Sequence, residues 1–397
     1  MPAEAKATPA AKPQGAWWND VRVRGILYQV VIVAAVLLAG WYLVSNTLHN
    51  LAARNIATGF SFLEREASFG ISEHVIEYSP ADSYGRAITV GLLNTLKVSL
   101  VGIVLATLLG TLVGIARLSS NWLVAKLATL YVEGVRNVPL LLQLFFWYTL
   151  ITEALPGPRQ SLNPLPGIFL NNRGLRVPSP VIETGHLGIL SGLVAAIAGG
   201  WILALWARQR QVRTGRGFPV WRTNAALLIG LPLLGFLAGG ARLVFDMPAL
   251  KGFNFSGGAT LTPEITALLA GLVVYTATFI AEIVRGGILS VAYGQTEAAL
   301  ALGLRRSLVM RLVLLPQALR VIVPPLTSQY LNLAKNSSLA VAIGYPDLVS
   351  VANTAINQTG QAIEGVAIIM GVFLAISLSI SAFMNWYNRR IALQGGR

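Results

Sequence analysis

Eight apolar segments, each close to the length of a membrane span, recur along this 397-residue chain. A helix needs about 20 mainly apolar residues to cross the hydrocarbon core of a bilayer. The candidate spans lie near residues 26–46, 90–116, 128–151, 187–206, 224–245, 264–288, 318–334 and 363–386. This pattern predicts an all-α, polytopic membrane protein with about eight transmembrane helices.

Composition favours the same class of protein. Hydrophobic residues make up 54% of the chain and charged residues only 12%, whereas charged residues form about a quarter of a soluble domain. The absence of cysteine excludes a disulfide framework and a thiolate metal site, and three scattered histidines leave little for a histidine metal centre. The net charge of +14 comes from basic residues that border apolar spans. We therefore expect the lipid bilayer, and not nucleic acid, as a partner.

Two of the eight segments are irregular. Segment 128–151 contains Arg136, Asn137 and Pro139, and segment 318–334 includes the pair Pro324-Pro325. Residues 1–25 are expected to form a disordered cytoplasmic tail, because the stretch before the first span is rich in Ala, Pro and Lys without periodicity. The first span lacks a small-residue cleavage site, so it is expected to remain as an anchor.

Basic residues predict the orientation of the spans. With the N-terminus in the cytoplasm, the inside segments carry 18 of the 30 Lys and Arg residues and the outside segments carry seven. This asymmetry favours both termini inside, since cytoplasmic segments are enriched in Lys and Arg. The outside segment 47–84 holds five acidic residues against two arginines, and we consider it one candidate landing surface for a partner.

The loop 294–316 lies between two apolar spans, on the cytoplasmic side in this orientation. Its small residues Ala298 and Ala299 follow Glu297, and Gly303 lies where one short helix can turn into a second before Leu315-Pro316 stops it. Two linked surface helices with an alanine-rich face suit insertion into a partner's groove. The loop is therefore expected to contact another protein.

These residues resemble a known family. Glu297-Ala298-Ala299, Gly303 and the end Val313, Leu315 and Pro316 match the EAA loop of binding-protein-dependent ABC importer permeases, with Val313 where the family usually has Ile. The match extends to segments 131–146, 282–287 and 335–339, which are similar to the polar amino acid subfamily. The whole chain most resembles the larger permease of general L-amino-acid systems of the Aap/Bzt type.

The resemblance implies a division of the chain. A type I importer permease core would comprise residues 90–151 and 263–390, with the coupling loop 294–316 inside its second part. Outside the core lie the first transmembrane helix with an acidic periplasmic segment (26–89), a periplasmic loop with an inserted transmembrane helix pair (152–262), and a cytoplasmic tail (391–397).

The resemblance also implies partners and a location. The expected partners are a cytoplasmic ABC ATPase dimer, a second permease subunit that is a related chain or a second copy, and a periplasmic amino acid binding protein. The location would be the bacterial inner membrane. The chain contains no Gly-Lys dipeptide and hence no Walker A loop. We expect it to be a translocation subunit without a cofactor, with ATP and Mg bound by the ATPase.

Two sets of residues are candidates for these roles. The expected ATPase-coupling residues are Glu297, Ala298, Ala299, Gly303, Leu315 and Pro316. Glu297 near the start of a short helix would be favoured by the helix dipole and could accept a basic residue of the ATPase. An amphipathic interfacial helix with a capping glutamate is the alternative interpretation.

The substrate path is expected to use polar side chains within or near the spans, where an unpaired charge costs at least a few kcal/mol. The candidates are Arg136, Gln143, Glu282, Lys335, Asn336 and Ser337. Arg136 and Gln143, seven residues apart, would share one helix face. Alternatively, Glu282 forms an intrahelical ion pair with Arg285, and Lys335 snorkels beside a helix-capping turn.

Two other classes of membrane protein fit the sequence less well. An ion-coupled secondary amino acid transporter should show repeated halves and paired ionisable residues near the midplane. The sequence shows no internal repeat and one clear pair. A membrane scaffold that only tethers a cytoplasmic protein would not need polar residues along the spans 128–151 and 318–334.

Overall fold

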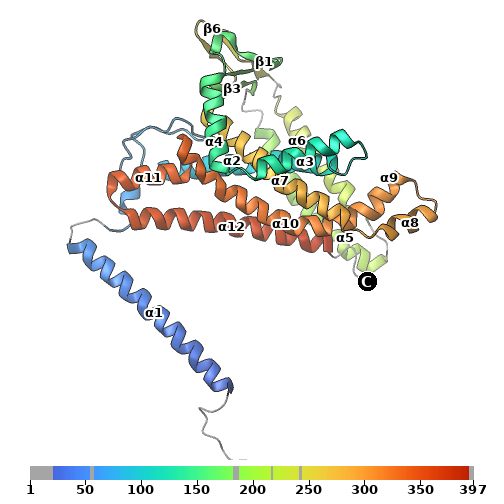
Figure 1. Ribbon diagram of the computed structural model, residues 1–397, viewed down its shortest axis with the longest axis horizontal. Helices are drawn as coiled ribbons and strands as arrows, with labels where there is room; N and C mark the ends of the chain where they lie inside the picture. The colour runs from blue at the N-terminus through green and yellow to red at the C-terminus, as the bar shows by residue number, and fades with distance from the viewer. Residues whose placement is uncertain (1–20, 54–57, 182–186, 216–217, 241–243, 393–397) are drawn as a thin grey trace, which may run out of the picture.

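The computed structural model describes residues 21–53, 58–181, 187–215, 218–240 and 244–392, which are mainly helical (Figure 1). The α-helices are α1 (Val21–Ala53), α2 (Tyr84–Ala116), α3 (Trp122–Arg136), α4 (Leu140–Thr149), α5 (Leu187–Thr214), α6 (Val220–Ala238), α7 (Pro263–Leu289), α8 (Tyr293–Ala301), α9 (Arg306–Val309), α10 (Leu315–Asn336), α11 (Leu348–Thr359) and α12 (Ala362–Ala392). Shorter turns are the 3-10 segments η2 (Phe60–Glu64), η4 (Pro158–Gln160) and η7 (Ser337–Ile343) and the π segments η3 (Leu150–Ala154) and η6 (Met310–Leu314). Of the expected tails, residues 1–20 and 393–397 lie outside the described residues.

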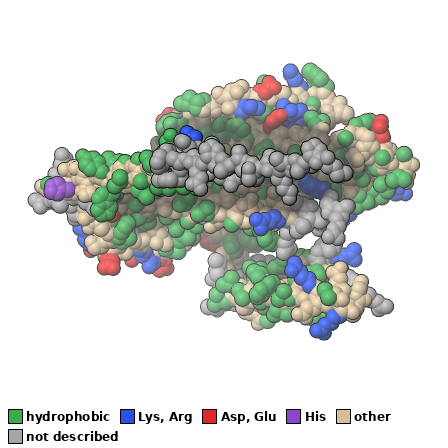
Figure 2. Space-filling view, turned by 90° about the horizontal axis from the view of Figure 1, so that it is seen from below, with side chains coloured by type: hydrophobic (Ala, Val, Ile, Leu, Met, Phe, Trp, Pro, Cys, Tyr) green, Lys and Arg blue, Asp and Glu red, His purple; other side chains and the backbone are tan. Residues whose placement is uncertain are grey.

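The predicted polytopic helical fold is confirmed. Within the described residues, six helical segments are long and apolar enough to cross a membrane: Val23–Thr47, Tyr84–Ala116, Leu187–Thr214, Pro263–Leu289, Arg306–Ile343 and Ala362–Arg389. Two shorter apolar helices, Leu140–Ala154 and Arg222–Ala238, occupy the other two predicted positions. Hydrophobic side chains cover much of the face in Figure 2, as a lipid-facing surface requires.

The third predicted span is not one helix, so the prediction of a continuous segment 128–151 was wrong. Helix α3 ends at Arg136 and α4 begins at Leu140, and the two helices run in different directions (Figure 1). Pro139 lacks an N–H and disfavours helical backbone at the residue before it. The Gln143 side-chain amide bridges the break by donating to the carbonyl oxygens of Val135 and Val138, each at 2.9 Å.

Helices α2 and α7 form the centre of the fold through close contact at two glycines. A Cβ on Gly110 would lie 2.7 Å from the Cβ of Ile280, and one on Gly114 would lie 2.7 Å from the carbonyl oxygen of Ala281. Small residues at a helix interface in a membrane let two backbones approach this closely. The Gly110-x-x-x-Gly114 pattern therefore sets the distance between the two helices.

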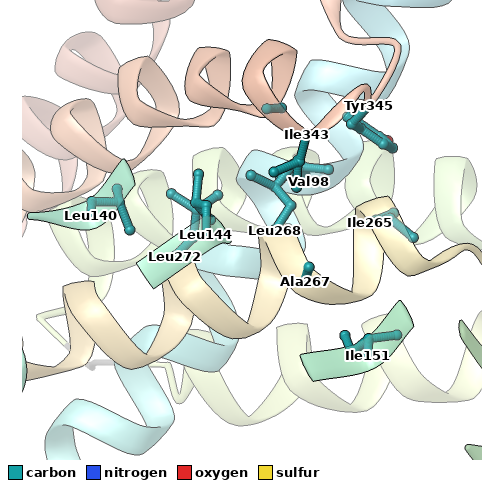
Figure 3. Close-up of a cluster of buried hydrophobic side chains, with 11 residues drawn as sticks. Val98, Leu140, Leu144, Ile151, Ile265, Ala267, Leu268, Leu272, Ile343 and Tyr345 are labelled. Carbon is teal, nitrogen blue, oxygen red and sulfur yellow. The ribbon is translucent and has the colours of Figure 1, made fainter. Parts of the chain in front are cut away.

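A buried apolar cluster lies against this helix pair (Figure 3). Its members come from α2, α4, η3, α7, η7 and the residues after η7, and they are Val98, Leu140, Leu144, Ile151, Ile265, Ala267, Leu268, Leu272, Ala340, Ile343 and Tyr345. The cluster joins both parts of the predicted permease core. It also packs the broken third segment against α7.

The segments between α4 and α7 contain short strands that the sequence analysis did not predict. Strands β1 (Leu162–Leu165), β2 (Ile168–Asn171), β3 (Gly174–Val177) and β8 (Ala259–Leu261) form an antiparallel sheet in the order β1-β2-β3-β8. Two further pairs are β4 (Ser179–Pro180) with β5 (Phe245–Asp246), and β6 (Ala249–Lys251) with β7 (Asn254–Ser256). Strands of two to four residues are too short to give a clear alternation of apolar and polar residues.

Helices α5 and α6, inserted between β4 and β5, form a hairpin that packs on itself. A Cβ on Gly188 would lie 2.1 Å from the carbonyl oxygen of Gly235, and one on Gly192 would lie 2.4 Å from that of Leu231. Helix α1 instead lies apart from the other helices (Figure 1), and nearly all of its described side chains are exposed. The α5–α6 hairpin and α1, which both lie outside the predicted core, thus have apolar surfaces suited to lipid.

Buried polar groups fix the end of the bundle where α2 and α7 begin. The Glu73 carboxylate accepts from Lys97 Nζ at 2.7 Å and from Thr262 Oγ1 at 3.2 Å. Asn94 Nδ2 donates to the Glu73 carbonyl at 2.7 Å and to the Pro346 carbonyl at 2.9 Å. The sequence analysis counted Glu73 in an acidic outer segment, but its side chain is buried and connects segment 58–83 to α2 and to the cap of α7. Asn94 extends these contacts to Pro346, just before α11.

Asp347 caps α11 at the same end of the bundle. One carboxylate oxygen accepts from the Ser350 N–H at 2.8 Å, while the other is buried without a hydrogen-bond partner. Burial raises the pKa of Asp347 to about 6, from its ordinary value of 3.8. Burial, together with Glu73 and Asp347, also raises the pKa of the Tyr345 hydroxyl.

Gly110→Ala should destabilise the protein, because the added methyl overlaps Ile280. Overpacking of this kind costs about 1–3 kcal/mol. Gly286→Ala is the matched control, since no atom lies within 4 Å of its added Cβ. Thermal unfolding in detergent micelles should show a lower Tm for Gly110→Ala only, and equal Tm values would contradict the close-contact interpretation.

Asp347 should make stability depend on pH between about 4 and 6. In this window the folded state binds more protons than the unfolded state, so stability falls as pH rises, by about 3 kcal/mol for a shift of this size. Asp347→Asn keeps the helix cap and should remove this part of the pH dependence. Thermal unfolding across pH checks it, with the exposed Glu66→Gln as control; a variant that retains the full wild-type slope contradicts the assignment.

Candidate functional site

The segment between α7 and α10 projects from one end of the helical bundle (Figure 1). It consists of α8, α9 and η6 and connects α7 to α10, and its last two elements form the start of the apolar segment Arg306–Ile343. The prediction of two short linked helices in the loop 294–316 is therefore correct in its local structure. Three residues separate α7 from α8.

Gly303 makes the turn that ends α8. Its φ is +76°, in the left-handed region that side chains disfavour. The Gly303 N–H donates to the Leu300 carbonyl at 2.9 Å, and the Leu304 N–H donates to the Ala299 carbonyl at 3.2 Å. This pair of bonds is a Schellman motif, which requires the left-handed residue. The predicted position of Gly303 at the turn is confirmed.

The prediction that Leu315-Pro316 stops the second helix was wrong. Helix α9 continues through the π turn η6 into α10, and the Leu315 N–H donates to the Met310 carbonyl five residues earlier. Pro316 lies in the first turn of α10, where proline is tolerated. Toward the C-terminus α9 is thus continuous with α10, whereas a three-residue connector separates α8 from α7.

Glu297 is the fifth residue of α8, so the argument that it lies near the helix start was wrong. No acidic residue occupies the first turn of α8, and no side chain caps the helix. Glu297 and Ala298 are exposed, whereas Ala299 is buried. Among the described residues, no ion pair involves Glu297. Its carboxylate is therefore available to a partner.

Two exposed apolar residues of this segment were missed by the sequence analysis. Leu302 is 82% exposed and Tyr293 is 73% exposed. An apolar recess of about 850 Å³ lies between the ends of α2 and α7 and the start of α10, with Ile115, Ile288 and Leu314 among its lining residues. The segment presents apolar side chains together with one free carboxylate.

The predicted pair Glu282 and Arg285 is present and has a third member. Arg285 donates to Glu282 Oε1 at 2.5 Å, and Arg117, at the end of α2, donates to Glu282 Oε2. The sequence could not reveal Arg117 as a partner, because 165 positions separate it from Glu282. The triad ties α2 to α7 near the end from which α8 projects.

The other path candidates do not converge on one site. Arg136 and Gln143 do not share a helix face, because the chain breaks between them; the Arg136 guanidinium lies 6.0 Å from the Phe279 ring centroid. Lys335 is exposed near the end of α10, about 30 Å from its start at a rise of 1.5 Å per residue. Glu282 lies at the opposite end of the bundle from Lys335.

Asn336 and Ser337 form no helix-capping turn. The backbone passes directly from α10 into η7 at these residues, without a side-chain cap. Asn336 is half-buried, and the Ser337 hydroxyl is buried and donates to the Ala334 carbonyl at 2.8 Å. The substrate-path role of these residues, and of Gln143 and Glu282, stays a prediction.

Comparison with known proteins gives a consistent result. Residues 102–393 match the family described as the binding-protein-dependent transport system inner membrane component. The chain is 51% identical to AapQ of Rhizobium johnstonii, a general L-amino acid transport system permease protein, over 94% of each chain. It is 41% identical to BztB of Rhodobacter capsulatus, a permease protein for glutamate, glutamine, aspartate and asparagine, over 94% of this chain and 95% of BztB.

Two further matches extend the comparison. The chain is 54% identical to YhdX of Escherichia coli over 94% of this chain and 95% of that protein. A solved amino acid ABC transporter with histidines aligns with 77% of this chain and 95% of its own, at 21% identity and a TM-score of 0.46. The resemblance to Aap/Bzt type permeases is confirmed by the sequence relatives. The chain belongs to the family of binding-protein-dependent transport system inner membrane components.

Proposed function

We propose that this chain is the membrane-spanning permease subunit of an ABC importer that moves L-amino acids into the cytoplasm. The projecting α8–α9 segment carries the proposal, because it offers exposed apolar residues and a free carboxylate between two spanning helices. Permeases for L-amino acids are among the relatives with more than 40% identity. The subunit is not itself an enzyme.

Partners complete this function. Two copies of an ATPase subunit would bind ATP and Mg and receive α8–α9 in a groove, with Glu297 accepting a basic residue of the ATPase. A second permease, either a related chain or a second copy, would form the other wall of the path. A periplasmic binding protein would deliver the amino acid. The basic-residue count supports an inner-membrane orientation with both termini in the cytoplasm.

The connections of α8–α9 support its role in coupling. A shift of α8 acts on α7 through a three-residue connector, and a shift of α9 acts on α10 through the continuous turn η6. The triad of Arg117, Glu282 and Arg285 adds α2 to the same unit. Motion received at α8–α9 would therefore move three spanning helices together.

Gly303→Val should uncouple the transporter, because the left-handed backbone at this position is strained for a β-branched residue by more than about 1 kcal/mol. Uptake by vesicles that contain all subunits should fall at least about tenfold, with the variant still present in the membrane. Gly371→Val, with no atom within 4 Å of the added Cβ, is the control. Normal uptake by Gly303→Val would remove the coupling role.

Gln143→Leu separates a structural role of Gln143 from a path role. Loss of the amide leaves the carbonyls of Val135 and Val138 without their donor, at a cost of about 1–3 kcal/mol. We expect a lower Tm with an unchanged preference among competing amino acids in uptake assays. A changed preference at an unchanged Tm would instead support the path role.

Reconstitution tests the function itself. Uptake into proteoliposomes should require ATP, the ATPase subunit and the binding protein in addition to this chain. Uptake by the purified chain alone, driven by an ion gradient, would contradict the proposal and favour a secondary amino acid transporter.

A further inference from the structure

The short strands between α4 and α7 form a small body that projects from the helices (Figure 1). We call residues 155–181 and 244–262 the β unit. Its last strand, β8, ends at Leu261, and α7 begins at Pro263. Because α8 follows the other end of α7, the β unit and the α8–α9 segment lie at opposite ends of one 27-residue helix, about 40 Å long.

The β unit is joined firmly to α7. Strand β3 pairs with β8 up to the register Leu175↔Leu261, and Gly174 lies so close that a Cβ there would be 2.1 Å from the Leu261 carbonyl oxygen. Thr262 caps α7 and donates to the buried carboxylate of Glu73 at 3.2 Å. A force on the sheet is therefore transmitted to α7 without a flexible linker.

The surface of the β unit is basic. Its one acidic residue, Asp246, already accepts from the Gly258 N–H at 2.9 Å. No ion pair among the described residues reaches the four cations of the unit, which are Arg159, Arg173, Arg176 and Lys251. Burial and the nearby Arg173 lower the pKa of Arg176. These cations lack a counter-charge within the described part of the chain.

Exposed apolar side chains lie beside these cations. Phe253, at the tip of the β6–β7 hairpin, is 74% exposed, and the Arg159 guanidinium lies 3.8 Å from the centroid of its ring. Leu165 is 61% exposed. An aromatic ring stacked with an arginine is typical of residues that contribute most to protein interfaces.

The neighbouring segment 58–83 has the opposite charge. Glu64, Glu66 and Glu77 are exposed there, and no ion pair among the described residues involves them. The contact between Glu73 and Thr262 places this segment next to the β unit. An acidic partner is attracted by the β unit and repelled by the segment beside it, which fixes the orientation of docking.

We propose that the β unit is the docking platform for an acidic patch on the binding protein that delivers the amino acid. The inference rests on the proposed function, which puts α8–α9 in the cytoplasm and thus the β unit on the delivery side. Docking onto the sheet loads the N-terminal end of α7, and α7 carries that load to α8. The binding protein and the ATPase then act on opposite ends of the same helix, α7.

The test uses the complete transporter, with both permeases and the ATPase, in nanodiscs of phosphatidylcholine. ATP hydrolysis is measured against the concentration of the binding protein. The double variant Arg159→Glu/Lys251→Glu should raise the half-saturating concentration about tenfold at low salt, with unchanged hydrolysis in the absence of binding protein. The difference should shrink in about 0.5 M NaCl, because salt screens exposed charges.

Two further variants sharpen the test. Phe253→Ser should also raise the half-saturating concentration, but by a factor that changes little with salt. Lys126→Glu reverses an exposed charge on α3, which follows the coupling-side end of α2, and should leave the half-saturating concentration unchanged.

Several outcomes would overturn the proposal. Unchanged half-saturating concentrations for both β-unit variants would exclude this docking surface. Loss of the second permease from the purified variant would assign the β unit to contact between permeases. A defect that is absent in phosphatidylcholine nanodiscs and appears only in nanodiscs with anionic lipid would assign it to the membrane surface. If the wild-type transporter is not stimulated by any binding protein, the proposed function itself fails, and the docking variants are not at issue.

Discussion

The contact of α2 with α7 at Gly110 and Gly114 is the interaction on which the rest of the structure depends. Lipid surrounds helices with atoms as apolar as their own side chains, so close packing must hold helices together in a membrane. Two glycines permit that packing here. The contact brings the Arg117 guanidinium, at the end of α2, to Glu282 of α7. Toward the other end, Glu73 of segment 58–83 joins the two helices by accepting from Lys97 of α2 and from Thr262, which caps α7.

Features set by short stretches of sequence were predictable. Hydropathy located the spans, the spacing of Glu282 and Arg285 predicted their ion pair, and Gly303 predicted a turn. Pro139 also marked the break in the third segment, but the apolar run around it favoured one long helix. The burial of Glu73 and the partnership of Arg117 depend on residues more than 20 and 160 positions away, respectively, and no local pattern reports such contacts.

The two sets of candidate site residues differ in how far the sequence alone could place them, again because some depend on local and others on distant contacts. The α8–α9 segment is a local structure of two short helices and a glycine turn, so the helices and the turn at Gly303 were predictable from the spacing of a few residues. The continuation of α9 through η6 into α10 was not. The path candidates lie at both ends of the bundle, and Gln143 is engaged with the backbone. In the proposed transporter, a path between two permeases would be lined by surfaces of both, and this sequence describes one of them.

The order of helices along the chain has a consequence for biogenesis. The partners Gly110 and Ile280 are separated by roughly 170 residues, which take about 10–30 s to synthesise at 5–20 residues per second. During that interval α2 is in the membrane before α7 exists, and the Asn94 amide lacks the Pro346 carbonyl to which it later donates. The α5–α6 hairpin emerges within the same interval and satisfies itself through its own glycines. Because α5 and α6 pack against each other, their glycines are not open to the α2 surface that later packs against α7.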